Sequence, residues 1–199
     1  NYLFIKNIDK IYSKQMDIIE SQMMSAINFV KEAGGAGFFI GSYAYNKTFS
    51  GYASFTPLEE PKRMPNIDAL CIMPQTEKIF RSFEEKMKWY ETETNKLADE
   101  LIKNLNAQKI VKASKRYSTH DKNIYLFPGT LIEIKYKKFR GVISLEANCN
   151  IDCDMLNATY IKNNIPHWVL LLNVQHYAQH AGDKHSDRYK AMFDLLQAE

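Results

Sequence analysis

The sequence predicts an α+β domain: a largely antiparallel or mixed sheet flanked by helices, with a helical hairpin at its C-terminal end. Three observations support this class. An amphipathic helical pattern precedes the first short apolar strand, and a long charged helix separates the second strand from the later ones. Those later strands follow one another directly before two final helical segments. A chain of 199 residues can bury one good core, so we expect a single domain spanning 1–199.

The first half alternates helix and strand. Apolar residues from Met16 to Val30 recur at helical spacing, which predicts a helix over 13–31 that ends at "EAGGAG". A short apolar strand follows at 38–40. The segment "GSYAYNKTFSG" is typical of a turn leading into a short helix, and three prolines mark 51–65 as a loop.

The second half contains most of the predicted sheet. A strand is predicted over 66–73, and an amphipathic helix over 76–106 whose charge run indicates a solvated face. Further strands are expected at 109–118, 123–129, 130–137 and 139–149, the last two forming a hairpin around "KKFRG". Residues 165–182 and 187–198 predict the C-terminal helical hairpin, with Gly182 as a C-cap.

Composition narrows the class of protein. The formal charge of +3 is too small for nucleic-acid binding by net charge alone, although local basic clusters remain available. The three cysteines have no CxxC spacing, which favours a reducing, intracellular, cytoplasmic setting. The longest apolar run, "WVLLLNV", is too short to cross a bilayer, so no membrane partner is expected. The chain opens with Asn1 rather than methionine, as a trimmed product or a piece of a longer chain would.

Several residues have the spacing needed for nucleotide chemistry. Two-metal transfer requires carboxylates that bridge two divalent ions, and alternate residues of a strand point the same way. Asp68 supplies one strand carboxylate and Glu146 supplies an acid on the predicted hairpin. Gly41 and Ser42 form a turn suited to binding phosphates through backbone N–H groups. Asn66 occupies the position of a partner acid to Asp68.

This arrangement resembles the nucleotidyltransferase fold of the DNA polymerase beta superfamily, and most closely the poly(A) polymerase catalytic subunits of large DNA viruses. The resemblance implies transfer of AMP from ATP to an RNA 3′ end with Mg²⁺ or Mn²⁺. Gly41 and Ser42 fall on the phosphate motif, Asp68 on the second strand acid, and Glu146 near the third acid. The terminal "DKHSDRYKAMFDLL" resembles the basic helix of the family, which makes Arg188 and Lys190 candidate phosphate or RNA contacts.

Two departures from the family pattern bear on activity. Asn66 replaces the first acid, and Glu146 replaces the more usual aspartate. An amide oxygen can bind Mg²⁺ but adds no negative charge, so affinity for at least one ion should fall. The alternative is therefore a catalytically inactive protein of the same fold that binds RNA, a partner subunit or a second copy of itself.

Other acid and histidine patterns remain open. Asp152 and Asp154 form a second acid pair with one-residue spacing, but the asparagines around them indicate a loop. His176, His180 and His185 have spacing compatible with a zinc site, and equally with exposure on a helix and in the turn after it.

The predicted hairpin carries two further patterns. Glu133 and Lys135 match the acid-x-Lys half of a metal-dependent nuclease, with Pro65 to Asp68 as the other half. That separation is long for such a site, and alternating polar residues are also typical of an exposed strand. The stretch "KYKKFR" interleaves basic residues with Tyr136 and Phe139, which suits RNA stacking or simply a solvated hairpin tip.

Overall fold

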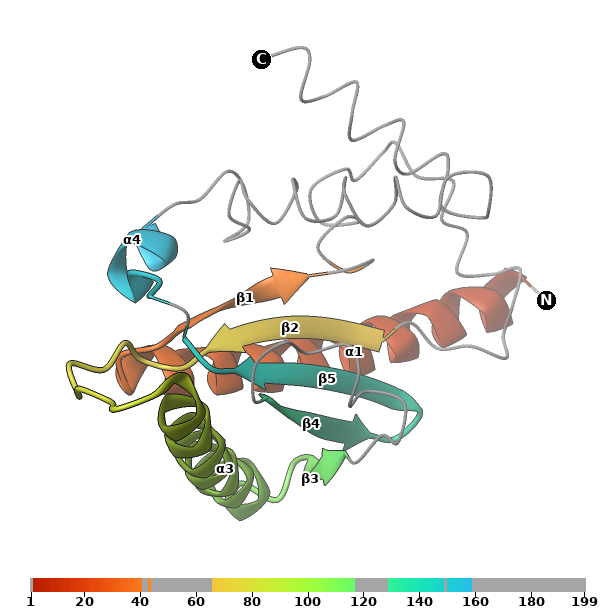
Figure 1. The fold of residues 1–199 in the computed structure, drawn as a ribbon. Helices are drawn as coiled ribbons and strands as arrows, with labels where there is room; N and C mark the ends of the chain where they lie inside the picture. The colour runs from red at the N-terminus through yellow and green to blue at the C-terminus, as the bar shows by residue number, and fades with distance from the viewer. Residues whose placement is uncertain (1, 41–42, 44–65, 117–128, 149, 159–199) are drawn as a thin grey trace, which may run out of the picture.

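The computed structural model describes residues 2–40, 43, 66–116, 129–148 and 150–158. Only the backbone is described for residues 2–13 and Asn66. The described elements in chain order are α1 (Tyr2–Glu32), β1 (Ala36–Ile40), β2 (Asn66–Ile72), α3 (Phe83–Ala107), β3 (Lys112–Arg116), β4 (Gly129–Tyr136), β5 (Phe139–Glu146) and α4 (Cys153–Ala158). Together they make an α+β fold (Figure 1).

The sheet is mixed, as the sequence predicted. Its five strands lie in the order β1-β2-β5-β4-β3. Three neighbouring pairs are antiparallel, and β2 pairs with β5 in parallel. Because β5 inserts beside β2, residues far apart in the sequence become neighbours at the centre of the sheet.

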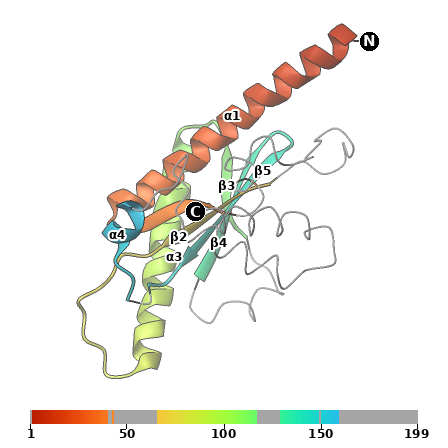
Figure 2. The same cartoon turned by 90° about the horizontal axis from the view of Figure 1, so that it is seen from above.

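One face of the sheet packs against α1 and α3. Helix α1 contacts β1, β2, β5 and β4, while α3 contacts β3, β4 and β5. Figure 2 shows α1 crossing the sheet diagonally, with its N-terminal end projecting beyond the strands. The largest fully buried side chains form this core: Ile19, Met23, Ile27, Ile67, Tyr90, Leu101, Leu105, Ile132, Ile134, Ile143 and Leu145.

Two strand glycines allow α1 to approach the sheet closely. A Cβ added at Gly141 would meet the thioether of Met23, and one at Gly37 would lie 3.0 Å from Ile27 Cγ2. Residues with side chains at these positions would push the helix outward, since packed interiors leave little free space.

Both long helices differ from the sequence prediction at their N-terminal ends. Helix α1 begins at Tyr2 rather than residue 13, and no glycine or proline interrupts the residues between. Helix α3 begins at Phe83 rather than near residue 76, because Ser82 is its N-cap and accepts a hydrogen bond from the Glu85 N–H. Glu85 in turn accepts from the Arg81 N–H at 2.8 Å, close to a capping-box arrangement.

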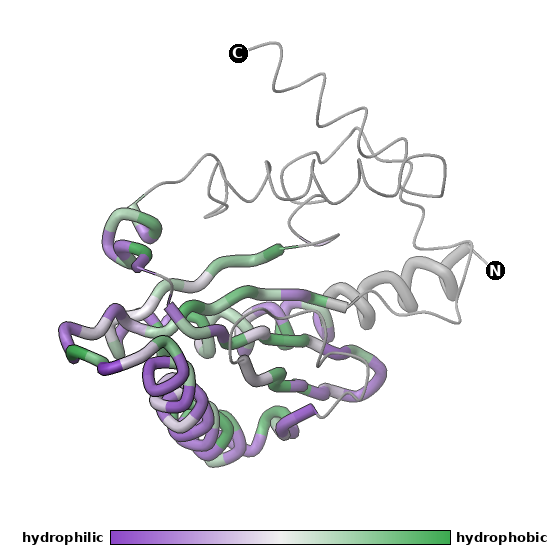
Figure 3. Tube along the Cα trace, viewed as in Figure 1, coloured by the Kyte–Doolittle hydropathy of each residue, from purple (hydrophilic) through white to green (hydrophobic). Residues whose placement is uncertain are grey.

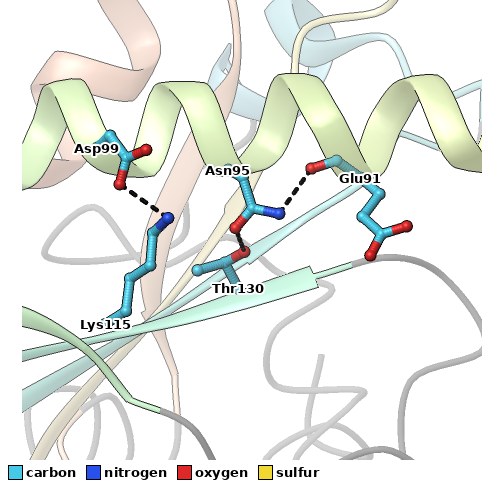
Figure 4. A network of polar contacts seen from close by, with 5 residues as sticks. All are labelled: Glu91, Asn95, Asp99, Lys115 and Thr130. Atoms are coloured by element: carbon cyan, nitrogen blue, oxygen red, sulfur yellow. Dashed lines mark hydrogen bonds and ion pairs between the residues drawn. The ribbon is translucent and has the colours of Figure 1, made fainter.

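Helix α3 also fixes the β3 and β4 side of the sheet. Lys115 of β3 forms an ion pair with Asp99 at 2.8 Å, and Thr130 of β4 donates to Asn95 at 3.3 Å (Figure 4). Hydrophilic residues cover much of α3 (Figure 3), in agreement with the predicted solvated face.

The predicted hairpin is confirmed, with β4 and β5 paired from Tyr136–Phe139 to Gly129–Glu146. Lys137 adopts a positive φ of 52° in the two-residue turn. The prediction of a loop around Asp152 was wrong in part, because α4 begins at Cys153, where Asp152 caps it by accepting from the Met155 N–H. The predicted strand at 123–129 lies outside the described residues except for Gly129, which begins β4. The short helix after Ser42 lies outside them except for Tyr43, and so does the whole C-terminal helical hairpin.

Candidate functional site on the polar face of the sheet

The strand face opposite the core of α1 and α3 carries most of the charged residues of the sheet. Among the described elements, no helix packs across its centre, and α4 lies against β1. We call this surface the polar face; register places on it Ala36, Phe38 and Ile40 of β1, Asp68, Leu70 and Ile72 of β2, Arg140, Val142, Ser144 and Glu146 of β5, Leu131, Glu133 and Lys135 of β4, and Lys112, Ser114 and Arg116 of β3.

Asp68 lies near the middle of this face rather than at a strand end. It pairs with Ile40 on one side and with Val142 on the other, and Val142 in turn pairs with Glu133. Asp68 and Glu133 therefore share one cross-strand row, separated by two strand spacings, or about 10 Å between Cα atoms. The tertiary fold thus sets in one row two carboxylates that the sequence connected only through the nuclease pattern.

Glu133 is engaged by two cations. Its side chain is only 11% exposed, and its carboxylate lies 3.0 Å from Lys135 Nζ and 3.2 Å from Arg140 Nη1. Burial acts to raise the pKa of Glu133, but the hydrogen bond and charge of Lys135 and the charge of Arg140 outweigh it, so this pKa is lowered. Glu133 is therefore a persistent anion held in place by its partners.

Asp68 has the opposite electrostatic character. Burial raises the pKa of its carboxyl group, and the charges of Arg140 and Arg116 only partly offset this effect. These arginines stand on either side of the row that joins Asp68 to Glu133. A half-buried acid that is subject to the charge of two arginines is suited to meeting a ligand that carries phosphate.

The strand that leads into the predicted phosphate turn lies beside Asp68. Ile40, the last residue of β1, pairs with Asp68, and Gly41 and Ser42 follow it in the chain. Gly41 and Ser42 themselves lie outside the described residues. Tyr43 is described: its ring centroid lies 4.7 Å from that of Phe39 and its side chain is hydrogen-bonded to Glu20 of α1. The two residues that flank the Gly-Ser pair, Ile40 and Tyr43, therefore both pack against the core.

Glu146 lies at the far end of the polar face from Asp68. Glu146 pairs with Ile72, whereas the residue opposite Asp68 is Val142. Glu146 therefore lies four residues along β5 from Val142, and four residues of a strand span about 13 Å. Its carboxylate accepts a hydrogen bond from Ser144 at 3.1 Å, and burial raises its pKa despite that bond. Carboxylates that bridge a pair of ions about 4 Å apart must lie much closer together. The register does not bring Glu146 to Asp68 in that way.

The described carboxylates do not assemble a two-ion site. Within the described part of the chain, no three His, Cys, Asp or Glu side chains gather closely enough to hold a metal ion. Asp152 is used as a helix cap, and Glu133 is bound by Lys135 and Arg140. The described residues therefore do not fit the bridged pair of ions that the family resemblance implies.

Other predicted site residues belong, wholly or in their side chains, to the part of the chain outside the described structure. Arg188 and Lys190, like the three histidines of the possible zinc site, lie outside the described residues. The side chain of Asn66 is not described, but its backbone pairs with Arg140.

Sequence reasoning missed Arg140, which lies on the strand next to Asp68, and Arg116, whose charge also acts on the pKa of Asp68. The signal for Arg140 was partly available, because the hairpin turn at 137–138 fixes which residues of β4 and β5 share a face. The parallel pairing of β2 with β5 carries no local signal, since the two strands are far apart in the sequence.

The nuclease pattern is only partly assembled. Glu133 and Lys135 lie on one face and contact each other, but β5 lies between them and Asp68. In the basic and aromatic hairpin pattern, Phe139 cannot stack on RNA bases, because it is 3% exposed and packs in the core.

Comparison with known proteins assigns no relative. No protein-family model matches the chain, and no curated protein matches it significantly. No helix in the described residues is long and apolar enough to span a bilayer.

Proposed function

We propose that the chain is a nucleotidyltransferase-like domain that binds ATP and an RNA 3′ end on the polar face and transfers AMP between them. The observation that carries the proposal is the pairing of Ile40 with Asp68. This pairing puts the strand that leads into Gly41 and Ser42 directly beside the strand that carries the acid. A nucleoside triphosphate with a bound cation requires phosphate-binding N–H groups close to a carboxylate, and this pairing supports that role for Gly41 and Ser42.

In this proposal Asp68 would hold the cation of the incoming nucleotide, while Arg140 and Arg116 would offset negative charge on the phosphates. A divalent ion would supply Lewis-acid stabilisation of the phosphoryl oxygens. Asn66 weakens the site because it contributes no charge where the family carries an acid. We therefore expect weak activity from the chain as it stands.

A second candidate is a non-catalytic domain of the same type that binds RNA or a protein subunit. The observation in its favour is the state of Glu133, the carboxylate that shares a row with Asp68. Its two oxygens are already engaged by Lys135 and Arg140, at 3.0 and 3.2 Å. A carboxylate paired in this way is a poor replacement for the missing acid at Asn66.

Extension of a labelled oligo(A) primer with ATP and Mg²⁺ or Mn²⁺ tests both candidates. Asn66→Asp should raise extension, and the isosteric change Asp68→Asn should abolish it. Asp99→Asn is the matched control, because Asp99 is an exposed carboxylate on α3, away from the polar face. Comparison of Glu133→Gln with Glu146→Gln identifies which second carboxylate contributes.

Two outcomes would reject the enzymatic proposal. The first is extension that survives Asp68→Asn unchanged. The second is a wild-type chain and an Asn66→Asp variant that are both inert while still binding oligo(A), which would instead support the non-catalytic candidate.

A further inference from the structure

A row of basic residues crosses the hairpin end of the polar face. Register aligns Lys112 of β3, Lys135 of β4 and Arg140 of β5 side by side. The next residue across the sheet is Asn66, two residues before Asp68 on β2. The row therefore leads from the outer edge of the sheet to the strand that carries the candidate acid.

The hairpin turn extends this basic surface. Lys137 and Lys138 occupy the turn between β4 and β5, and both are exposed. We call these five residues the basic row: Lys112, Lys135, Lys137, Lys138 and Arg140. Glu133 offsets part of the charge, since it lies against Lys135 and Arg140. Within the described part of the chain, Lys112 and Lys138 have no ion-pair partner.

We propose that the basic row binds the phosphate backbone of single-stranded RNA and guides its 3′ end toward Asp68. The inference rests on the proposed function, and it adds the path by which the nucleic acid reaches the site. Charge complementarity identifies the ligand, because lysines spaced by about 5 Å across adjacent strands match a flexible polyanion. Base stacking contributes little, since Phe139 is buried and the ring of Tyr136 is half-buried beneath Lys137, whose Nζ lies 5.5 Å from the ring centroid.

The test measures binding of fluorescent oligo(A) to the full chain without nucleotide or metal, across a range of salt concentrations. The double variant Lys112→Gln/Lys138→Gln removes two charges and leaves the partners of Glu133 in place. Lys88→Gln/Lys96→Gln removes two charges from exposed positions of α3 and serves as the matched control.

Loss of two phosphate contacts should reduce the slope of log affinity against log salt by about 1.4 for a single strand. Because this contribution vanishes near 1 M salt, affinity at 0.1 M should fall about 25-fold. The control variant should bind as the wild type does. The proposal is overturned if both double variants weaken binding equally. It is also overturned if the wild-type chain fails to bind oligo(A) at low salt, a result that would leave an acidic protein surface as the ligand.

A kinetic readout separates this inference from the proposed function. If the enzyme is active, Lys112→Gln/Lys138→Gln should raise the KM for primer, whereas Asp68→Asn should lower kcat. If binding depends on the basic row but no variant extends the primer, the transferase proposal fails and the RNA path stands. If Asp68 is required for extension but the basic row does not affect binding, the RNA path fails and the transferase proposal stands.

Discussion

Asn148 joins the end of β2 to the segment that leads into α4, and its replacement should destabilise the fold. The residue is fully buried and is the second residue after the end of β5. Its Nδ2 donates to the carbonyls of Met73 and Ile151 at 3.0 and 2.9 Å, and its Oδ1 accepts from the Ile151 N–H at 2.6 Å. We expect Asn148→Ala to lower the free energy of unfolding.

The magnitude follows from the three hydrogen bonds. At a net value of about 1 kcal/mol each, their loss amounts to about 3 kcal/mol. For a chain of this size that corresponds to a fall in Tm of roughly 6–12 °C. Asn148→Asp keeps the acceptor but turns a second oxygen toward two carbonyls, so the loss at neutral pH should be at least as large. It should shrink in acid, because a protonated carboxyl group restores one donor.

Urea unfolding followed by circular dichroism measures this effect, with the m-value checked for constancy. Asn104→Ala on α3 is the control, because its side chain is exposed and bonded only to Gln108 in the described structure. We expect the control to stay within about 0.5 kcal/mol of the wild type. An equally small change for Asn148→Ala would refute the reasoning from buried hydrogen bonds.

The remaining predictions concern charge and close packing. Burial raises the pKa of Asp68, so ionisation destabilises the fold, and Asp68→Asn should gain stability relative to wild type as pH rises from 3 to 7. The pKa of Glu133 is lowered, so its stabilisation appears above its ordinary pKa, and Glu133→Gln should lose stability over the same range. Urea unfolding at both pH values checks this, and trends of the same sign would contradict it. Gly35→Ala would press a Cβ against the Ile72 carbonyl oxygen and should lower the unfolding free energy by at least about 1–3 kcal/mol, more than Gly37→Ala; an inverted order in thermal unfolding would contradict this contact geometry.

Local patterns predicted most of the described elements. The spacing of Met16, Ile19, Met23, Ile27 and Val30 predicted the face of α1 that meets the sheet, and all except the partly buried Met16 are buried in the core. The β4–β5 hairpin followed from alternating residues around a short basic turn. The beginnings of the helices were predicted less well, because the capping bonds of Ser82 and Asp152 depend on side-chain geometry that composition does not reveal.

The sequence by itself determined the α+β class and the position of Asp68 within a strand, because these depend on periodicity over a few neighbouring residues. Only the tertiary structure decided which charges surround that acid. The parallel insertion of β5 beside β2 brings Arg140 close to Asp68, sets Glu133 in the same row and leaves Glu146 four residues away. Such pairings join residues separated by long stretches of chain, so they are set by packing of the whole sheet against α1 and α3 rather than by any local pattern.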